Sequence, residues 1–88
     1  MIRRRVVVHG FVQGVFFRDA VLRRAVTGGV GGWVRNNRDG TVEAVFEGEV
    51  SAVESLVRFC HESPRGASVE RVEIAAEDPE GLGAFRIF

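Results

Sequence analysis

The segment from Gly10 to Arg18 combines residue types that suit the binding of an anion. Gly10 and Gly14 stand four positions apart between an apolar run and a helical stretch, a spacing that favours a tightly curled loop. A curled run of backbone N–H groups that leads into a helix N-terminus forms a nest for tetrahedral oxyanions such as phosphate. The planar guanidinium of Arg18 can hold two oxygens of the same anion. The loop and Arg18 together therefore indicate an anion site.

Charge is distributed unevenly along a chain whose formal net charge is zero. Residues 1–38 carry eight arginines against one acid, a net charge of +7, while residues 39–88 carry four arginines against eleven acids, a net charge of −7. We therefore expect anions to prefer the first half of the chain. All twelve basic residues are arginine, which excludes lysine Schiff-base catalysis and a phosphate-binding loop that depends on lysine.

Length and composition predict a single domain over residues 1–88. A chain of 88 residues buries about 60–65% of its unfolded surface, which is sufficient for folding when 45% of the residues are apolar. Cys60 has no second cysteine to pair with, and with only two histidines a four-ligand zinc site is excluded. The apolar run near the N-terminus is too short for an export signal, and no segment is long enough to span a membrane. We expect a cytoplasmic protein.

The elements around the loop follow from apolar periodicity and turn residues. A β-branched run over residues 5–9 predicts a short central strand. Helical spacing over residues 18–27, followed by a Gly-Gly pair, predicts a helix. Its expected buried face consists of Val21, Leu22, Ala25 and Val26. Strands are expected over residues 32–38 and 41–47, because the Asp-Gly pair between them is a strong hairpin signal.

The second half predicts one more helix and two more strands. Ser51 and Glu54 have the spacing of a capping box, and Pro64 is expected to end the helix that follows. The apolar residues of this helix recur at i, i+3, i+4 and i+7: Val53, Leu56, Val57 and Cys60. A fourth strand is expected to contain Val69, Val72 and Ile74, and residues 85–88 form a short final strand.

The order strand, helix, strand, strand, helix, strand predicts the fold class. It is that of an α+β ferredoxin-like (split β-α-β) sandwich, with an antiparallel sheet of four to five strands and two helices on one face. This topology hosts enzymes, RNA binders and metabolite sensors, so the fold alone does not decide the function.

Three motifs occur together in the first half of the chain. They are Gly-Phe-Val-Gln-Gly-Val-Phe-Phe-Arg at residues 10–18, Gly-Trp-Val-Arg-Asn at residues 32–36 and Asp-Gly-Thr-Val-Glu at residues 39–43. Together they closely resemble the acylphosphatase family, and the resemblance extends in looser form over essentially the whole chain. It implies hydrolysis of acyl phosphates to a carboxylate and inorganic phosphate by direct in-line attack of water, without metal, cofactor or covalent intermediate. The implied partner is a small-molecule acyl phosphate, with no nucleic acid or membrane, and we expect a monomer.

The resemblance also implies a role for individual residues. Arg18 matches the phosphate-binding arginine, and Asn36 matches the asparagine that positions the attacking water. Phe11 stands where the family often has arginine. The backbone amides that match the phosphate cradle are those of Gln13, Gly14, Val15, Phe16 and Phe17. Outside such motifs an arginine at a helix start is usually a solvated residue and an asparagine near a hairpin is usually a turn residue. The joint occurrence of both in matched motifs favours the functional roles.

Other conspicuous residues have a structural interpretation. The side chain of Gln13 is expected to pin the loop rather than touch substrate, and His9 is expected to be structural. The arginines at positions 3–5 are expected to lie on a solvated strand edge, with steering of an anionic substrate as the alternative. Residues expected to be buried in the core are Phe16, Phe17 and Trp33, and Cys60 is expected to be an inert buried thiol.

Three other functions remain open at this point. An RNA-binding ferredoxin-like domain would need an aromatic series on its third strand, whereas residues 41–47 carry Glu43 and Glu47 instead. A non-catalytic acyl-phosphate or anion-binding module would bind the substrate without consuming it. The chain also resembles a segment of a larger carbamoyl-transfer maturation protein, an alternative that we do not expect because residues 1–88 contain no cysteine-rich zinc module.

Overall fold

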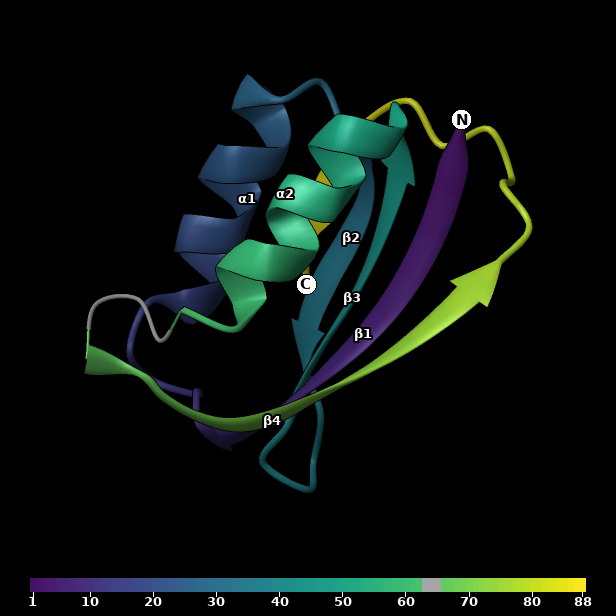
Figure 1. The fold of residues 1–88 in the computed structure, drawn as a ribbon. Helices are drawn as coiled ribbons and strands as arrows, with labels where there is room; N and C mark the ends of the chain where they lie inside the picture. Colours follow the sequence, from purple (N-terminus) through teal and green to yellow (C-terminus); the bar gives the residue numbers. More distant parts are fainter. Residues whose placement is uncertain (63–65) are drawn as a thin grey trace.

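The computed structural model describes residues 1–62 and 66–88, and within these ranges it contains every element predicted above (Figure 1). In chain order the elements are β1 (Ile2–Phe11), α1 (Phe17–Thr27), β2 (Gly31–Asn36), β3 (Val42–Gly48), α2 (Val50–Cys60), β4 (Ser68–Glu77) and β5 (Phe85–Ile87). The largest difference is in β1, which extends beyond the β-branched run at both ends.

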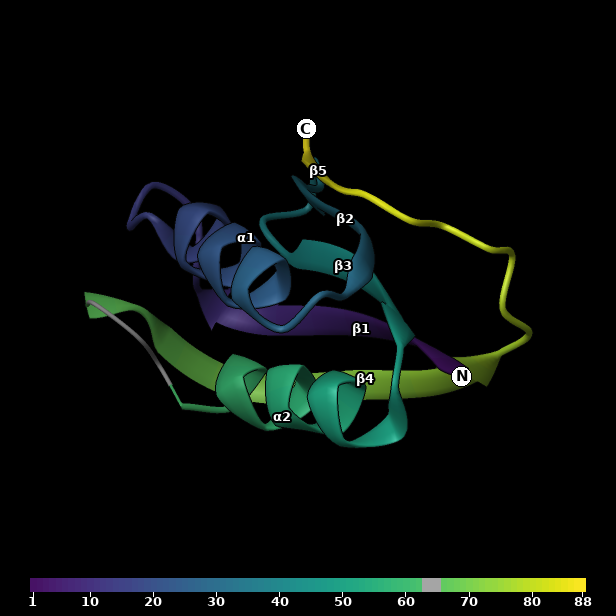
Figure 2. The same ribbon diagram turned by 90° about the horizontal axis from the view of Figure 1, so that it is seen from above.

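The strands form one sheet in the order β4-β1-β3-β2-β5. β1 pairs antiparallel with β3 and β4, and β2 pairs antiparallel with β3. Both helices pack against the same face of this sheet (Figures 1 and 2). The arrangement matches the predicted ferredoxin-like sandwich, except that β5 joins β2 in parallel, so the sheet is mixed.

The core lies between the two helices and the sheet. Because successive side chains of a strand point to opposite faces, Val6 and Val8 of β1 point toward the helices, and both are buried. β3 contributes Val42, Ala44 and Phe46 to the same core, and the helices contribute Phe17, Val21, Ala25, Val53, Leu56, Phe59 and Cys60. Burial raises the pKa of the Cys60 thiol to about 12, so this cysteine is an inert thiol at neutral pH.

No helix in residues 1–62 or 66–88 is long and apolar enough to cross a bilayer.

Two predictions of burial around α1 are wrong. The buried residues of this helix, Phe17, Val21 and Ala25, follow one another in steps of four, whereas Val26 lies about 100° further round the helix and is 65% exposed. Phe16 is 75% exposed because it precedes the helix in the loop. The prediction that Trp33 is buried in the core is also wrong. This residue is half-buried on the face of the sheet away from the helices, where the guanidinium carbons of Arg5 and Arg35 lie 5.4 and 4.9 Å from the centre of its ring.

The predicted start of α2 is also wrong. The helix begins at Val50 with Glu49 at the N-cap, and no side chain caps it. Ser51 therefore lies inside the first turn, two positions after the N-cap that a capping box requires. Its hydroxyl instead donates to a carboxylate oxygen of Glu49 at 3.4 Å. The predicted helix end at Pro64 lies outside the described residues.

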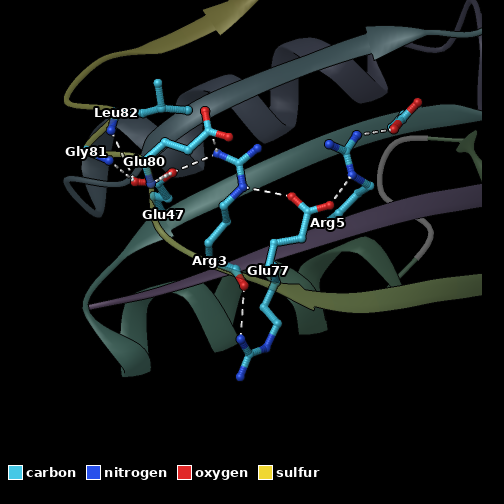
Figure 3. A network of polar contacts seen from close by, with 9 residues as sticks. Arg3, Arg5, Glu47, Glu77, Glu80, Gly81 and Leu82 are labelled. Carbon is cyan, nitrogen blue, oxygen red and sulfur yellow. Dashed lines mark hydrogen bonds and ion pairs between the residues drawn. The ribbon is translucent and has the colours of Figure 1, made fainter.

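The face of the sheet away from the helices carries a network of ion pairs (Figure 3). Arg3 of β1 donates to Glu47 of β3 at 2.7 Å and to Glu77 of β4 at 2.8 Å. Arg5 donates to Glu77 at 2.7 Å and pairs with Glu43. The predicted solvated strand edge is wrong, because β1 lies between β3 and β4 and Arg3 is buried.

Candidate active site

The loop between β1 and α1 has the curled backbone that its glycines predict. Gly14 has a φ of +73° and Phe16 a φ of +61°, both in the left-handed region. A phenylalanine in this conformation is strained, and such strain concentrates at functional sites. The curl places the loop directly before α1, which begins at Phe17. Within the described part of the chain, the backbone N–H groups of residues 14–17 have no acceptor. They form an anion nest at a helix N-terminus.

A cavity of about 210 Å³ opens beside this loop. It brings Arg18, at the start of α1, together with Asn36, at the end of β2. Its lining consists of Val12, Gly14, Phe16, Phe17, Arg18, Asp19, Asn36 and Ile87. The two side chains that the sequence singles out therefore face one cavity.

Gln13 and Val15 do not line this cavity. The side-chain amide of Gln13 donates to the backbone oxygen of Asn37 at 2.7 Å and to that of Thr41 at 3.0 Å. Gln13 thus pins the loop to the β2–β3 turn, as predicted, while Val15 packs against the core. Phe11 is 64% exposed at the end of β1 and is not part of the lining.

The turn that follows Asn36 is held by several hydrogen bonds. The side-chain amide of Asn37 donates to the hydroxyl of Thr41 at 3.0 Å and to the carboxylate of Glu43 at 3.2 Å. The Asp39 carboxylate accepts from the hydroxyl of Thr41 at 2.6 Å and from its N–H at 3.0 Å, and these bonds hold the pKa of Asp39 below its ordinary value. The side chain of Asn36 is exposed and makes no hydrogen bond within the described residues. A rigid turn therefore presents a free carboxamide to the cavity.

β5 supplies part of the site that the motifs did not predict. Ile87 lines the cavity, and the backbone oxygen of Phe88 accepts a hydrogen bond from the Arg18 guanidinium. The backbone N–H of Phe88 donates in turn to the oxygen of Val34 on β2, at 2.9 Å. The position of Arg18 thus depends on a segment seventy residues further along the chain.

The charge around the cavity is concentrated on Arg18. Arg3, Arg5 and Arg35, which contribute to the positive first half, are paired with carboxylates on the far face of the sheet. Asp19, which lines the cavity, is paired with Arg23 at 3.1 Å. Arg18 has no aspartate or glutamate partner among the described residues, and its guanidinium donates to the oxygen of Phe88, the last residue of the sequence. Three of the eight arginines in residues 1–38 are therefore paired on the far face of the sheet, away from the loop.

The remaining candidates lie away from the cavity. His9 pairs with Glu73 of the neighbouring strand β4, which agrees with its predicted structural role. In residues 1–62 and 66–88, no cluster of three or more histidine, cysteine or acidic side chains could hold a metal ion. The arrangement can bind a phosphoryl group through backbone N–H groups and one guanidinium, with a carboxamide nearby.

Comparison with known proteins agrees with this geometry. The family model described as Acylphosphatase matches residues 4–87. The chain is 61% identical over 79 residues to an acylphosphatase of Rubrobacter xylanophilus, covering 90% of this chain and 72% of that protein. It is 52% identical over 85 residues to one of Haloarcula marismortui, covering 97% and 93%. The crystal structure of an acylphosphatase from Bacillus subtilis superposes with a TM-score of 0.95 at 34% identity, covering 100% of this chain and 99% of that one. The chain therefore belongs to the acylphosphatase family.

Proposed function

We propose that the acyl-phosphate hydrolysis of this enzyme takes place in the cavity between the β1–α1 loop and Asn36. The observation that carries the proposal is that three groups belong to residues lining this cavity: the unpaired N–H groups of the loop (Gly14, Phe16 and Phe17), the guanidinium of Arg18 and the carboxamide of Asn36. Each group has a distinct task in moving a phosphoryl group to water.

The chemistry requires positioning rather than a strong acid. The leaving group is a carboxylate whose conjugate acid has a pKa of about 4.3, so it departs without being protonated. What remains is to hold a dianionic phosphoryl group, balance the charge on its equatorial oxygens and place water in line. The loop amides and Arg18 supply the first two requirements at the N-terminus of α1.

Asn36 supplies the third requirement. Its carboxamide can accept from a water proton and donate nearby, but it cannot remove that proton at neutral pH. The water oxygen forms a bond to phosphorus while the bond between phosphorus and the acyl oxygen breaks. The carboxylate leaves with the bonding electrons, and a phosphate oxygen of the substrate receives the proton from the water. The products are a carboxylate and inorganic phosphate, so atoms and charge balance without another reactant.

Hydrolysis of benzoyl phosphate beside a phosphate monoester tests the proposed activity. We expect rapid turnover of benzoyl phosphate and little turnover of the monoester, because only the first substrate has a leaving group that needs no acid. The rate should be unchanged in EDTA, since a guanidinium supplies the charge that a metal would otherwise bring. Hydrolysis of neither substrate would refute the activity. Loss of turnover in EDTA with recovery in magnesium or zinc would refute the mechanism.

The proposed groups also predict a shallow pH profile. Neither a guanidinium nor a carboxamide changes its charge between about pH 5 and pH 8, so kcat should change only modestly over that range. The profile of the His9→Ala variant should be the same, because His9 faces Glu73 and does not line the cavity. The measurement is kcat against pH for both proteins. A steep limb in the wild type that disappears in His9→Ala would assign His9 to the reaction.

We further propose one domain over residues 1–88, acting as a cytoplasmic monomer on a small molecule without nucleic acid. The presence of β1 and β5, which come from opposite ends of the chain, in one sheet supports the single domain. The ion pairs of Arg3, Arg5 and Arg35 fill the open face of the sheet, where a related RNA-binding domain would stack bases, and so argue against that alternative. Light scattering on the purified chain tests the monomer, and a labelled RNA pool tests the absence of nucleic-acid binding.

A further inference from the structure

Glu47 of β3 holds the segment that connects β4 to β5. Its side chain is fully buried, and its carboxylate accepts from the backbone N–H groups of Glu80 at 2.8 Å, Gly81 at 2.9 Å and Leu82 at 3.1 Å. The same carboxylate accepts from the guanidinium of Arg3 at 2.7 Å (Figure 3). The buried carboxylate thus accepts four hydrogen bonds, and we call Glu47 with these four bonds the Glu47 anchor.

The anchor fixes a segment that has no regular structure of its own. Residues 78–84 contain neither helix nor strand, and they cross one end of the sheet between β4 and β5 (Figures 1 and 2). Burial alone would raise the pKa of Glu47. The hydrogen bonds from the three N–H groups and from the Arg3 guanidinium lower it by more, so the pKa of Glu47 lies below its ordinary value. The carboxylate is thus charged at neutral pH, and charge-assisted hydrogen bonds of this kind are among the stronger ones in proteins.

The crossing segment also lies directly against β2. A Cβ atom on Gly31 would lie 2.0 Å from the backbone oxygen of Leu82, closer than real atoms approach. Gly31 does not have a positive φ, so the close approach alone accounts for the need for glycine here. Gly31 is the direct partner of Glu47 in the pairing of β2 with β3, so both act on the segment from the same face of the sheet. Glu47 binds the segment, and the missing side chain at Gly31 leaves room for it beside Glu47.

From the anchor the chain leads directly to the active site. The oxygen of Ala84 accepts from the N–H of Gly32 at 2.9 Å, and β5 then runs beside β2. At the far end of this short strand, Ile87 lines the cavity and the oxygen of Phe88 accepts from Arg18. β5 has only three residues, so its own ladder is a weak determinant of its position.

We propose that Glu47 is a positioning residue for the phosphate site, acting through residues 78–84 and β5 on the guanidinium of Arg18. This role rests on the proposed function of Arg18. When the anchor is lost, β5 loosens, and Arg18 loses the backbone oxygen that holds its guanidinium beside the loop. Arg18 keeps its charge but is then ordered only when phosphate or substrate binds, so the loss weakens the binding of phosphate and substrate more than it slows the bound reaction.

Three variants test the role by phosphate Ki, KM, kcat and thermal midpoint. Glu47→Gln removes the charge of the anchor, and Gly31→Ala pushes the segment away while leaving the pair of Arg3 and Glu47 intact. For both we expect Ki and KM to rise together by roughly three- to tenfold, the scale of loosening one charge-assisted hydrogen bond, with kcat within about twofold of wild type. Glu77→Gln is the matched control, because Glu77 also pairs with Arg3 but does not bond to the segment. Its Ki should equal that of the wild type even where its thermal midpoint falls.

The outcomes separate this role from general stability and from the proposed function. Suppose that the wild type hydrolyses acyl phosphate and that Glu47→Gln and Gly31→Ala bind phosphate as tightly as the wild type. This result overturns the positioning role of Glu47 and leaves the proposed function intact. A Ki raised equally in Glu77→Gln also overturns the positioning role, because that result reports a general loosening of the sheet. A kcat lowered at unchanged KM overturns it too, because that pattern reports a smaller folded fraction. If Glu47→Gln does not fold, Gly31→Ala decides the question. A wild type that neither binds phosphate nor turns over benzoyl phosphate contradicts the proposed function instead.

Discussion

Replacing Arg18 with alanine is expected to lower kcat/KM for benzoyl phosphate by about 10³-fold, the scale of losing a guanidinium that balances charge on a transferring phosphoryl group. Arg18 holds that group in the ground state and balances the additional charge on its equatorial oxygens in the transition state, so the Ki for phosphate should rise and kcat should fall together. Arg18→Lys keeps a positive charge but loses the two-pronged geometry, so its activity should lie between those of the alanine variant and the wild type.

A second arginine of the same helix provides the control. Arg23 is exposed and, in residues 1–62 and 66–88, pairs only with Asp19, so Arg23→Ala should have nearly wild-type kcat and Ki. The measurements are kcat, KM and phosphate Ki for the three variants. Equal losses in Arg18→Ala and Arg23→Ala would show that overall charge, and not the cavity, accounts for the effect.

Asn36→Ala should lower kcat by roughly 10²–10³-fold and leave the phosphate Ki nearly unchanged. The reason is that Asn36 is assigned to the attacking water, whereas the phosphate is held by the loop and Arg18. The thermal midpoint should change little, because the side chain of Asn36 is exposed and makes no hydrogen bond within the described residues.

The neighbouring asparagine should show the opposite pattern. Asn37→Ala removes hydrogen bonds to Thr41 and Glu43, so its thermal midpoint should fall, while kcat of the folded enzyme should fall less than in Asn36→Ala. Kinetics and thermal unfolding of both variants distinguish the two roles. If the kcat of Asn36→Ala were near that of the wild type, Asn36 would not position the attacking water and would be an ordinary turn residue.

Local patterns in the sequence predicted most of the fold. The apolar runs, the Asp-Gly hairpin and the loop glycines each act over a few residues, and all the elements that they predict are present. The errors occur where local pattern competes with packing. Val26 fits the helical repeat but lies beyond the stripe that faces the sheet, and Phe16 is aromatic but lies in the loop. Ser51 matched a cap motif although the helix begins one residue earlier.

The site was predictable only in part for a similar reason. Arg18 and Asn36 belong to two motifs, so their meeting in one cavity follows from the fold class. The contact between Arg18 and Phe88 carries no local signal, because it depends on the parallel pairing of β5 with β2. Glu47 and Glu77, the partners of Arg3, also lie far from it in sequence. No local pattern therefore indicated the buried ion pair, and Arg3 was predicted to lie on a solvated strand edge.

A crystal structure with bound phosphate tests the central claim most directly. We expect the anion to be enclosed by the backbone N–H groups of residues 13–17, with the Arg18 guanidinium on two of its oxygens. A water held by Asn36 should lie in line with the position of the leaving oxygen. An anion bound only elsewhere on the molecule, with the loop empty and splayed, would contradict the account.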